Sequence, residues 1–451
     1  MATTVDVIVI GTGSAAQAVA YKTREAGWSV AVVDSRPFGG TCQLRGCDPK
    51  KMLVGVSELV DWSRRMQGKG VSAPALAIEW PEMIQFKRSY TDPGPAENAQ
   101  AFAQAGILAR EGRAHFVDRT SVEVGSETLV GRYVAIAGGA RHATLGIPGE
   151  DELTTSTQFL ELDHLPRRIL FVGGGYIAFE FAHIAARAGA QVRVLHRGSR
   201  PLEKFDPDLV GMLVEATRGL GVDVGLNTEV VAIERQGDHL LVQARNPAAQ
   251  QQTFEADMVV HAAGRVPEID DLNLEVAGVA RTPAGVLVNE YLQSVSNSAV
   301  YAAGDAVDSG GFPLTPVAGM QGAILASNLL KGNHRTPNYA GIPSVVFTTP
   351  PLARVGLTEE AARAQGLRFA TNQGDTSDWY TSRRVALRHT GFKTIIEEGS
   401  GRILGAHLLG EHAEEVINLF GLAISTGITS SDLKHAVFAY PTGASDIGSM
   451  L

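Results

Sequence analysis

The N-terminal part of the chain alternates short apolar runs with an alanine-rich stretch of helical spacing. Residues 5–10 form a β-rich apolar run that breaks at residues 11–16, and a helical pattern follows as far as Ala26. A second apolar run starts at Trp28 and ends at Asp34. The pattern predicts a strand, a glycine turn, a helix and a second strand.

The glycine turn has the spacing of a dinucleotide-binding fingerprint, with Gly11, Gly13 and Ala16 at its key positions. The glycines allow the backbone to approach a pyrophosphate, and the N-terminus of the following helix attracts its charge. Asp34, about twenty residues further on, is placed to accept a hydrogen bond from a ribose hydroxyl. Alanine at the third glycine position is a tolerated variant, so the stretch predicts a dinucleotide site.

The same order of elements recurs as a strand, a glycine turn, a helix and a strand at residues 168–172, 173–178, 179–188 and 191–195. Gly173 and Gly175 open the second turn, but no carboxylate occupies the position that Asp34 has in the first copy. Arg197 and Arg200 come after the second strand instead. Arginine accommodates a 2′-phosphate, so this site favours NADPH over NADH, unless the two arginines are merely solvated surface residues.

Cys42 and Cys47 are the only cysteines in the chain and are five positions apart. At the start of a helix, two such sulfurs could meet as an easily reduced disulfide, and the helix N-terminus would favour the thiolate that reduction produces. The flanking residues Gly40, Gly46 and Pro49 suit a tight entry into a helix. The alternative is a pair of free buried cysteines.

Composition narrows the classes of protein. The 451 residues, 44% hydrophobic and 19% charged, predict an ordinary globular protein of roughly three domains. A net charge of −9 without a basic block argues against a nucleic-acid partner. The absence of a long apolar stretch and of a signal-type N-terminus predicts a cytoplasmic protein without a membrane span. In a reducing compartment, two cysteines are more often catalytic or metal-binding than structural.

Residues 39–51, with the sequence GGTCQLRGCDPKK, resemble the GGTCxNxGCxPSK redox segment of the pyridine nucleotide-disulfide oxidoreductases. This family includes glutathione reductase, dihydrolipoamide dehydrogenase and mercuric reductase. Cys42 and Cys47 match its cysteines, and Lys50 is matched to its lysine. Further segments resemble the family's ATG, GRxPN and second FAD motifs, the stretch after the latter, and the start of its dimerisation domain: residues 135–139, 264–268, 300–305, 314–318, and 342–351 with 355–359.

The resemblance implies an α/β fold of two Rossmann-like dinucleotide-binding domains and a C-terminal α+β interface domain. It also implies a homodimer with one FAD per chain, and the dimer interface would be formed mainly by residues after Leu330. The order of the motifs places the FAD-binding domain at residues 1–148 and 266–334, the NAD(P)H-binding domain at 149–265 and the interface domain at 335–451.

The resemblance also implies roles for individual residues. Electrons would pass from NADPH through FAD to a disulfide, with Cys47 against the flavin and Cys42 as the interchange thiol. Lys50 and Glu180 would pair near the flavin N5, and Tyr176 would be a gate for the nicotinamide. Asp305 follows an apolar run as a strand-end carboxylate, and the family uses it on the ribityl chain. The other expected contacts are Gly40, Thr41, Ala137, Gly138, Thr315 and Ala318 with FAD, and Gly264 with NADPH.

One segment departs from the family pattern. Disulfide reductases of this family place a histidine from the partner subunit, in an HPTxxE segment, beside the outer cysteine. This chain has Tyr440 at that position and lacks the glutamate, and we expect Tyr440 to face Cys42 across the dimer interface. A tyrosine with a pKa of about 10 is poorly suited to cycle a proton near neutral pH.

Mercuric reductases also carry tyrosine at this position, and a thiolate-bound soft metal ion needs no proton to leave. They also use a C-terminal cysteine pair, whereas no cysteine comes after Cys47 here. The expected acceptor is therefore a small molecule, with a soft metal ion or a quinone as candidates, and no resident metal site is expected. The alternatives are a disulfide reductase of the glutathione reductase or dihydrolipoamide dehydrogenase type, and a redox sensor without steady turnover.

Overall fold

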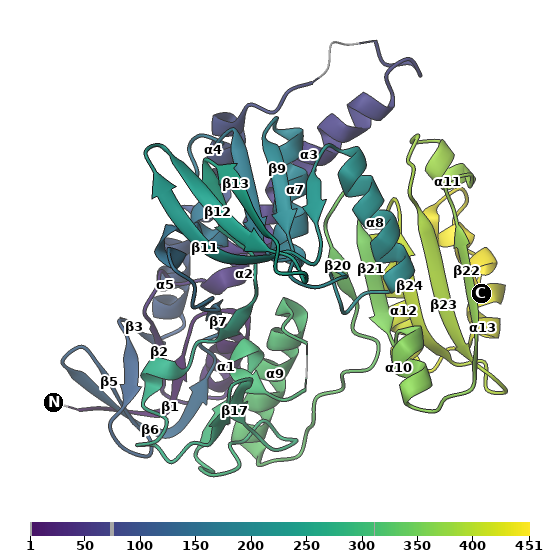
Figure 1. Ribbon diagram of the computed structural model, residues 1–451. Helices are drawn as coiled ribbons and strands as arrows, with labels where there is room; N and C mark the ends of the chain where they lie inside the picture. Colours follow the sequence, from purple (N-terminus) through teal and green to yellow (C-terminus); the bar gives the residue numbers. More distant parts are fainter. Residues whose placement is uncertain (1, 73–75, 311) are drawn as a thin grey trace. The chain divides into compact units, whose positions relative to one another are not determined.

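The computed structural model describes residues 2–72, 76–310 and 312–451, which form two compact units (Figure 1). The first unit comprises Met1–Lys50, Gln85–Ala143 and Arg265–Tyr339, and the second comprises Lys51–Ile84, Thr144–Gly264 and Ala340–Leu451. The chain thus leaves and re-enters each unit. The four segments predicted from the order of the motifs stay a prediction.

In the described residues of the first unit, seven strands form one sheet in the order β3-β2-β1-β6-β5-β4, with β18 also paired to β6. β1, β2, β3, β6 and β18 pair in parallel, and β4 and β5 are added antiparallel. The Val and Ile side chains of β1 are buried, as expected for a parallel sheet covered on both faces. The strands are β1 (Thr3–Ile10), β2 (Val30–Asp34), β3 (Leu108–Glu111), β4 (Ala114–Phe116), β5 (Ser121–Val124), β6 (Glu127–Ile136) and β18 (Val300–Ala302).

The remaining strands described in this unit form two smaller sheets. One pairs β7 (Ala140–His142) with β15 (Arg265–Pro267), and the other contains β16 (Arg281–Thr282), β17 (Gly285–Leu287) and β19 (Val307–Asp308). The helices are α1 (Ser14–Glu25), α2 (Gly40–Arg45), α5 (Gly94–Gln104), η2 (Asp270–Leu272), η3 (Gly304–Ala306) and α9 (Thr315–Lys331). α1 and α9 pack closely because Gly322 has no side chain. A Cβ there would lie 2.4 Å from the carbonyl oxygen of Ala15. α3 (Cys47–Arg65) and α4 (Trp80–Thr91) each begin in one unit and end in the other.

The second unit contains three sheets among its described residues. A parallel sheet has the order β10-β9-β8-β14, and two antiparallel sheets have the orders β11-β12-β13 and β20-β21-β24-β23-β22. The strands are β8 (Arg168–Val172), β9 (Gln191–Leu195), β10 (Asp223–Gly225), β11 (Glu229–Gln236), β12 (His239–Arg245), β13 (Gln251–Ala256), β14 (Met258–His261), β20 (Ser344–Val346), β21 (Leu352–Gly356), β22 (Phe369–Asp375), β23 (Gly391–Glu397) and β24 (Ile403–Leu409).

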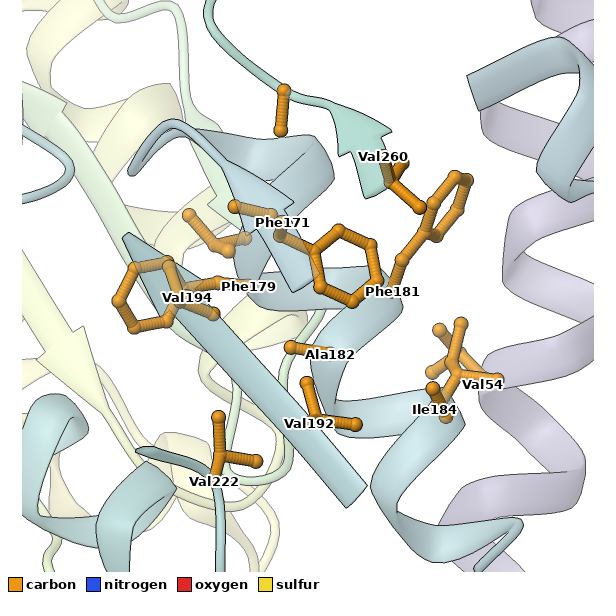
Figure 2. Packing of buried hydrophobic residues seen from close by; sticks show 14 of the residues in the cluster. Val54, Phe171, Phe179, Phe181, Ala182, Ile184, Val192, Val194, Val222 and Val260 are labelled. Carbon is orange, nitrogen blue, oxygen red and sulfur yellow. The ribbon is translucent and has the colours of Figure 1, made fainter. Parts of the chain in front are cut away.

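The helices of the second unit are η1 (Glu150–Glu152), α6 (Ser156–Phe159), α7 (Tyr176–Arg187), α8 (Pro207–Gly219), α10 (Glu359–Ala364), α11 (Tyr380–Arg383), α12 (Ala413–Thr426), α13 (Ser430–His435), η4 (Gly443–Asp446) and α14 (Ile447–Met450). α7 is the most enclosed, because its residues are buried on nearly every face. Figure 2 shows its side chains against β8, β9 and β14, and against Val54 of α3. The rings of Phe159 and Phe181 stack there at 4.7 Å.

A buried ion pair joins two parts of the second unit. Lys393 of β23 is 3% exposed, and its Nζ lies 2.9 Å from Oδ2 of Asp206, whose side chain is fully buried. Asp206 also caps α8, because its Oδ1 accepts hydrogen bonds from the backbone N–H groups of Asp208 and Leu209. Asp208 is a second partner of Lys393. This cluster therefore fixes the start of α8 to the five-stranded sheet.

The predicted fold class is confirmed, and the differences are local. The helix after the second glycine turn begins at Tyr176 rather than at Phe179, so Tyr176 and Glu180 lie one turn apart on the same helix. The first helix ends at Glu25. None of the helices in the described ranges combines the length and apolar character needed to cross a bilayer.

Candidate active site

The two glycine turns have the same backbone arrangement. Gly11 has φ +111°, and a Cβ on it would lie 2.3 Å from the carbonyl oxygen of Ala137. Gly173 has φ +125°, and a Cβ on it would lie 2.1 Å from the carbonyl oxygen of Ala262. At both positions the neighbouring strand end leaves no room for a side chain, so the glycines predicted from the sequence are sterically required.

Among the described residues, no side chain caps the first turn of the helices that follow these two glycine turns. The capping residues are Gly13 for α1 and Gly175 for α7, and glycine has no side chain with which to bond the first turn. Such a helix end attracts phosphate through its free N–H groups and its dipole. Ala16, the third fingerprint residue, is fully buried. Both turns therefore have the geometry of a pyrophosphate site.

The strand after the first glycine turn ends in a carboxylate that two hydrogen bonds hold in place. Asp34 is the last residue of β2, and its Oδ2 accepts a hydrogen bond of 2.6 Å from Oγ1 of Thr12 in the glycine turn. Its Oδ1 accepts a bond of 3.0 Å from the backbone N–H of Arg36. These bonds hold the carboxylate beside the turn, where a ribose hydroxyl can donate to it.

The second copy has a histidine at the corresponding place. His196 comes after Gly173 by the same number of residues as Asp34 after Gly11. Its ring lies so close to Gly174 that a Cβ there would be 2.7 Å away, and its Nε2 bonds the carbonyl oxygen of Arg200 at 3.0 Å. Burial lowers the pKa of His196, so the ring is neutral at pH 7.

The two arginines after β9 differ in their surroundings. Arg197 is exposed and forms no ion pair with any described residue. Arg200 is half-buried and donates from Nη2 to the carbonyl oxygen of Glu203, while its Nε is buried without a hydrogen-bond partner among the described residues. The side chain of Arg197 is therefore the freer of the two to meet an anion.

The cysteine segment starts against the first glycine turn. Gly40 has φ +74°, and a Cβ on it would lie 2.4 Å from Cα of Gly13. The sequence suggested that both cysteines lie at the start of one helix, but in the structure they belong to two helices. Cys42 lies in α2, which ends before Gly46, and Cys47 is the first residue of α3. Both are free thiols in the structure.

The two sulfurs nevertheless interact. A hydrogen bond with Cys47 is the largest cause that raises the pKa of Cys42, and burial and the negative charge of Asp48 raise it further. The expected stabilisation of a thiolate by a helix N-terminus therefore does not dominate at Cys42 in this reduced form. Oγ1 of Thr315, the first residue of α9, lies 3.5 Å from Sγ of Cys47. Thr315 thus brings a predicted FAD contact to the cysteine pair.

Sequence reasoning missed the partners of Cys42. Sγ of Cys42 is 3.6 Å from Oδ1 of Asp48, and Oδ2 of Asp48 accepts a 3.0 Å hydrogen bond from the hydroxyl of Tyr90. The available signal was a charged residue between Cys47 and Pro49, at a position that the family motif leaves open. Tyr90 has no such signal, because it lies 42 residues beyond Asp48 in the chain.

The predicted ribityl contact, Asp305, lies in η3 directly after β18. β18 pairs in parallel with β6, and β6 with β1, so their carboxyl ends bring Asp305, Ala137–Gly138 and Gly11 to one edge of the sheet. Gly304 lies close to Ala318 of α9, since a Cβ there would be 3.4 Å from that methyl group. The FAD contacts predicted in the first unit, Gly11, Ala137, Gly138 and Asp305, therefore lie at the same edge of the sheet.

The charges at this edge fit FAD. Burial raises the pKa of Asp305, and the positive charge of Arg265 opposes that shift. Nε of Arg265 is buried without a hydrogen-bond partner among the described residues. A cationic donor with a buried Nε, a carboxylate and the first glycine turn suit the pyrophosphate and hydroxyl groups of a flavin dinucleotide. FAD would be held by these residues together with Asp34, Gly40 and Thr41.

In the second unit, Tyr176 and Glu180 project from the start of α7. The Tyr176 ring packs edge-on against Phe205 at 5.6 Å, and burial raises the pKa of its hydroxyl. Glu180 is buried, and its Oε1 accepts a 2.8 Å bond from the backbone N–H of Phe347. Gly264 has φ +113°, and a Cβ on it would meet nothing within 4 Å.

The assignment of the flavin lysine needs a correction. Counted from Cys47, the lysine of the GGTCxNxGCxPSK motif falls on Lys51, not on Lys50. Lys50 is nevertheless the buried one, at 7% exposed, whereas Lys51 forms an ion pair with Glu58. Burial, rather than motif position, is thus what favours Lys50. Its pairing with Glu180, which lies in the other unit, stays a prediction.

Tyr440 lies in an exposed apolar segment near the C-terminal end. Its side chain is 82% exposed and that of Val437 is 98% exposed. Side chains of this kind are enriched in subunit interfaces, which accords with the expected position of Tyr440 at a dimer contact. Its approach to Cys42 of the partner subunit stays a prediction.

Known proteins resemble the chain over nearly its whole length. Residues 5–322 match the family model described as pyridine nucleotide-disulphide oxidoreductase, and residues 342–451 match the dimerisation domain of the same family. A mercuric reductase of Staphylococcus aureus is 32% identical over 97% of this chain and 80% of its own length. A glutathione reductase of Nostoc sp. is 31% identical over 99% of both chains.

Among solved structures, the chain is similar to the Cu(II) complex of the HOCl-induced flavoprotein disulfide reductase RclA from Escherichia coli. The TM-score is 0.88 at 27% identity, over 100% of this chain and 99% of that one. The match thus includes both glycine turns, the cysteine segment and the C-terminal sheet. With two nucleotide turns, a thiol pair at the first of them and a dimerisation domain, the chain belongs to the FAD-dependent pyridine nucleotide-disulphide oxidoreductases.

Proposed function

We propose that the protein uses NADPH to reduce the Cys42–Cys47 pair through FAD and passes the electrons to a soft metal ion. When bound, FAD accepts a hydride from the nicotinamide and transfers the electron pair onward. The chain supplies the acceptor for that pair, because reduction of a Cys42–Cys47 disulfide breaks the S–S bond and leaves two thiols. The hydrogen bond between Cys47 and Thr315 supports Cys47 as the sulfur nearer the flavin.

The observation that carries the choice of acceptor is Tyr440 in place of the catalytic histidine. A leaving thiolate from a disulfide substrate needs a proton near neutral pH, and a tyrosine hydroxyl is a poorer proton shuttle there than a histidine ring. A metal ion bound by thiolates is reduced without such a proton. Similarity to the mercuric reductase of S. aureus supports a metal acceptor, and the Cu(II) complex of the disulfide reductase RclA supports the binding of a metal ion to a protein of this fold.

An acceptor panel with the purified holoenzyme tests this proposal. NADPH oxidation would be measured without oxygen, using Hg(II), Cu(II), a quinone, oxidised glutathione and lipoamide as acceptors. We expect turnover with at least one metal ion and only slow turnover with both disulfides. Turnover of glutathione disulfide at the rate of an ordinary reductase would replace the proposal with a disulfide reductase function.

The disulfide reductase is the second candidate, favoured by the 31% identity to the Nostoc glutathione reductase over nearly the full length of both chains. Tyr440→His distinguishes the two. Under the metal proposal this change raises disulfide turnover, but by less than the 10²–10⁴ typical of general acid–base catalysis, because the orienting glutamate is absent. A flavoprotein that is reduced once by NADPH and then stalls with every acceptor would instead be a redox sensor.

NADPH is proposed as the reductant because two arginines come after β9 where the first copy has Asp34. The exposed Arg197 is the proposed contact for the 2′-phosphate, with Arg200 as the second. The family's dimerisation domain indicates a homodimer. We expect a yellow protein with one FAD per chain, and a colourless monomer would contradict this.

A further inference from the structure

Asp48 lies beside the thiol that is expected to meet the acceptor. Its Oδ1 is 3.6 Å from Sγ of Cys42, and its Oδ2 accepts a hydrogen bond of 3.0 Å from the hydroxyl of Tyr90. Tyr90 thereby holds one carboxylate oxygen while the other faces the sulfur. The family motif leaves the residue between the second cysteine and the proline open, so the family assigns no role to this carboxylate.

The charge next to Cys42 is therefore negative. Among the largest influences on the Cys42 thiol, the two electrostatic ones come from Cys47 and Asp48, and both disfavour a second negative charge. Arg45, the basic residue between the two cysteines, is directed elsewhere, since its charge interacts with Arg36, Asp34 and Glu268 at the ribose end of the first glycine turn. The interactions of Arg45 thus lie with these groups, and Lys51 pairs with Glu58.

We propose that Asp48 selects the charge of the acceptor that reaches Cys42, favouring cationic acceptors and excluding anionic ones. A fixed carboxylate a few ångströms from the reacting sulfur attracts a cation and repels an anion at the moment of contact. Metal ions are cations, whereas glutathione disulfide carries a net negative charge. The inference deepens the proposed function and rests on it for the role of Cys42 as the interchange thiol.

The charge preference can be measured without any physiological acceptor. The NADPH-reduced holoenzyme would be alkylated with iodoacetate, iodoacetamide and 2-bromoethylamine, which are anionic, neutral and cationic. In each case a cysteine thiolate displaces the halide and forms a thioether. Peptide mass spectrometry gives the rate at Cys42. A change in thiol pKa alters all three rates together, so the ratio of the cationic to the anionic rate reports charge selection alone.

We expect Asp48→Asn to lower this ratio about tenfold, and Asp48→Glu to keep it near the wild-type value. FAD content and the spectrum of the oxidised flavin check that both variants are folded. An unchanged ratio in Asp48→Asn overturns the inference, as does preferential alkylation of Cys47. If Asp48→Asn does not fold, the wild type still tests the idea. Raising the salt concentration should move its ratio toward that of a free thiol, and no salt dependence overturns the inference.

The two proposals fail separately. A fall in the ratio in Asp48→Asn, together with no metal turnover by the wild type, leaves the role of Asp48 in place and removes the metal acceptor. Metal turnover by the wild type, together with an unchanged ratio in Asp48→Asn, supports the metal acceptor and removes the role of Asp48. Cystamine and oxidised glutathione, disulfides of opposite charge, provide a steady-state check, because Asp48→Asn should narrow the difference between their kcat/KM values.

Discussion

The two glycine turns of this chain share their backbone contacts and differ in the side chain at the end of the next strand. The backbone N–H of Gly11 bonds the carbonyl oxygen of Val33 at 2.6 Å, and that of Gly173 bonds Leu195 at 2.9 Å. The first copy then places Asp34 against Thr12, whereas the second places His196 against Gly174. The comparison teaches that the turn provides a pyrophosphate site in general, and the residue at the end of the second strand determines which nucleotide it suits.

The largest effects should come from filling the turns themselves. Gly11→Ala and Gly173→Ala each force a residue with a side chain into a positive φ and against a carbonyl oxygen, at a cost of about 2–5 kcal/mol. If the copies serve different cofactors, Gly11→Ala loses FAD and its yellow colour. Gly173→Ala keeps FAD but is no longer reduced by NADPH. Flavin absorbance and stopped-flow reduction measure the two outcomes.

Two glycines that close the helices of the same copies provide matched controls. Gly27 and Gly189 have φ +90° and +98°, and a Cβ on either would meet nothing within 4 Å. Their alanine variants carry the conformational cost without the collision and should keep both cofactors. If Gly11→Ala and Gly173→Ala impair the same cofactor, the division of labour between the copies is wrong.

Asp34 should be the next most sensitive position. Asp34→Ala removes the carboxylate that Thr12 and the backbone of Arg36 hold in place, together with its proposed bond to the FAD ribose. A charge-assisted hydrogen bond contributes about 1.5–3 kcal/mol, so FAD should dissociate about ten- to a hundredfold more readily. Flavin release would be monitored by fluorescence. The KM for NADPH, measured with excess FAD, should stay unchanged.

Arg197→Ala tests the corresponding end of the second copy. The apparent KM for NADPH should rise about tenfold or more, and that for NADH should change little, because only NADPH has a phosphate to lose its partner. Arg193→Ala is the control, since this arginine of β9 pairs with Asp223 at the surface. Equal losses with NADPH and NADH would assign Arg197 a structural role.

The smallest expected effect comes from making the second copy resemble the first. His196 is neutral at pH 7, because burial lowers its pKa, and it therefore offers no charge to a phosphate. His196→Asp introduces a carboxylate at the position of Asp34, so it should weaken NADPH by repulsion and improve NADH about threefold. The ratio of kcat/KM for the two cofactors is the measurement. A ratio that moves toward NADPH would contradict the equivalence of the two positions.

The sequence predicted the features that depend on local pattern. Gly11, Gly173 and Asp34 were found because strand, turn and helix periodicities place them without knowledge of the tertiary structure. The relation of Cys42 to Cys47 was only partly predicted, because Gly46 has φ −147° and ψ −112° and separates two helices where one was expected. The contact of Asp48 with Tyr90 could not be predicted, since it joins residues that are distant in the sequence.

The ion pair between Lys393 and Asp206 has a consequence for how this chain can diverge. Replacing Lys393 leaves the fully buried Asp206 without its lysine, which costs about 3–5 kcal/mol, whereas replacing Asp206 leaves Lys393 paired with Asp208. The two sites therefore constrain each other unequally, because Asp206 can be replaced first and Lys393 cannot. Lineages descended from this protein should keep Lys393 wherever they keep Asp206, although the two residues lie 187 positions apart in the chain.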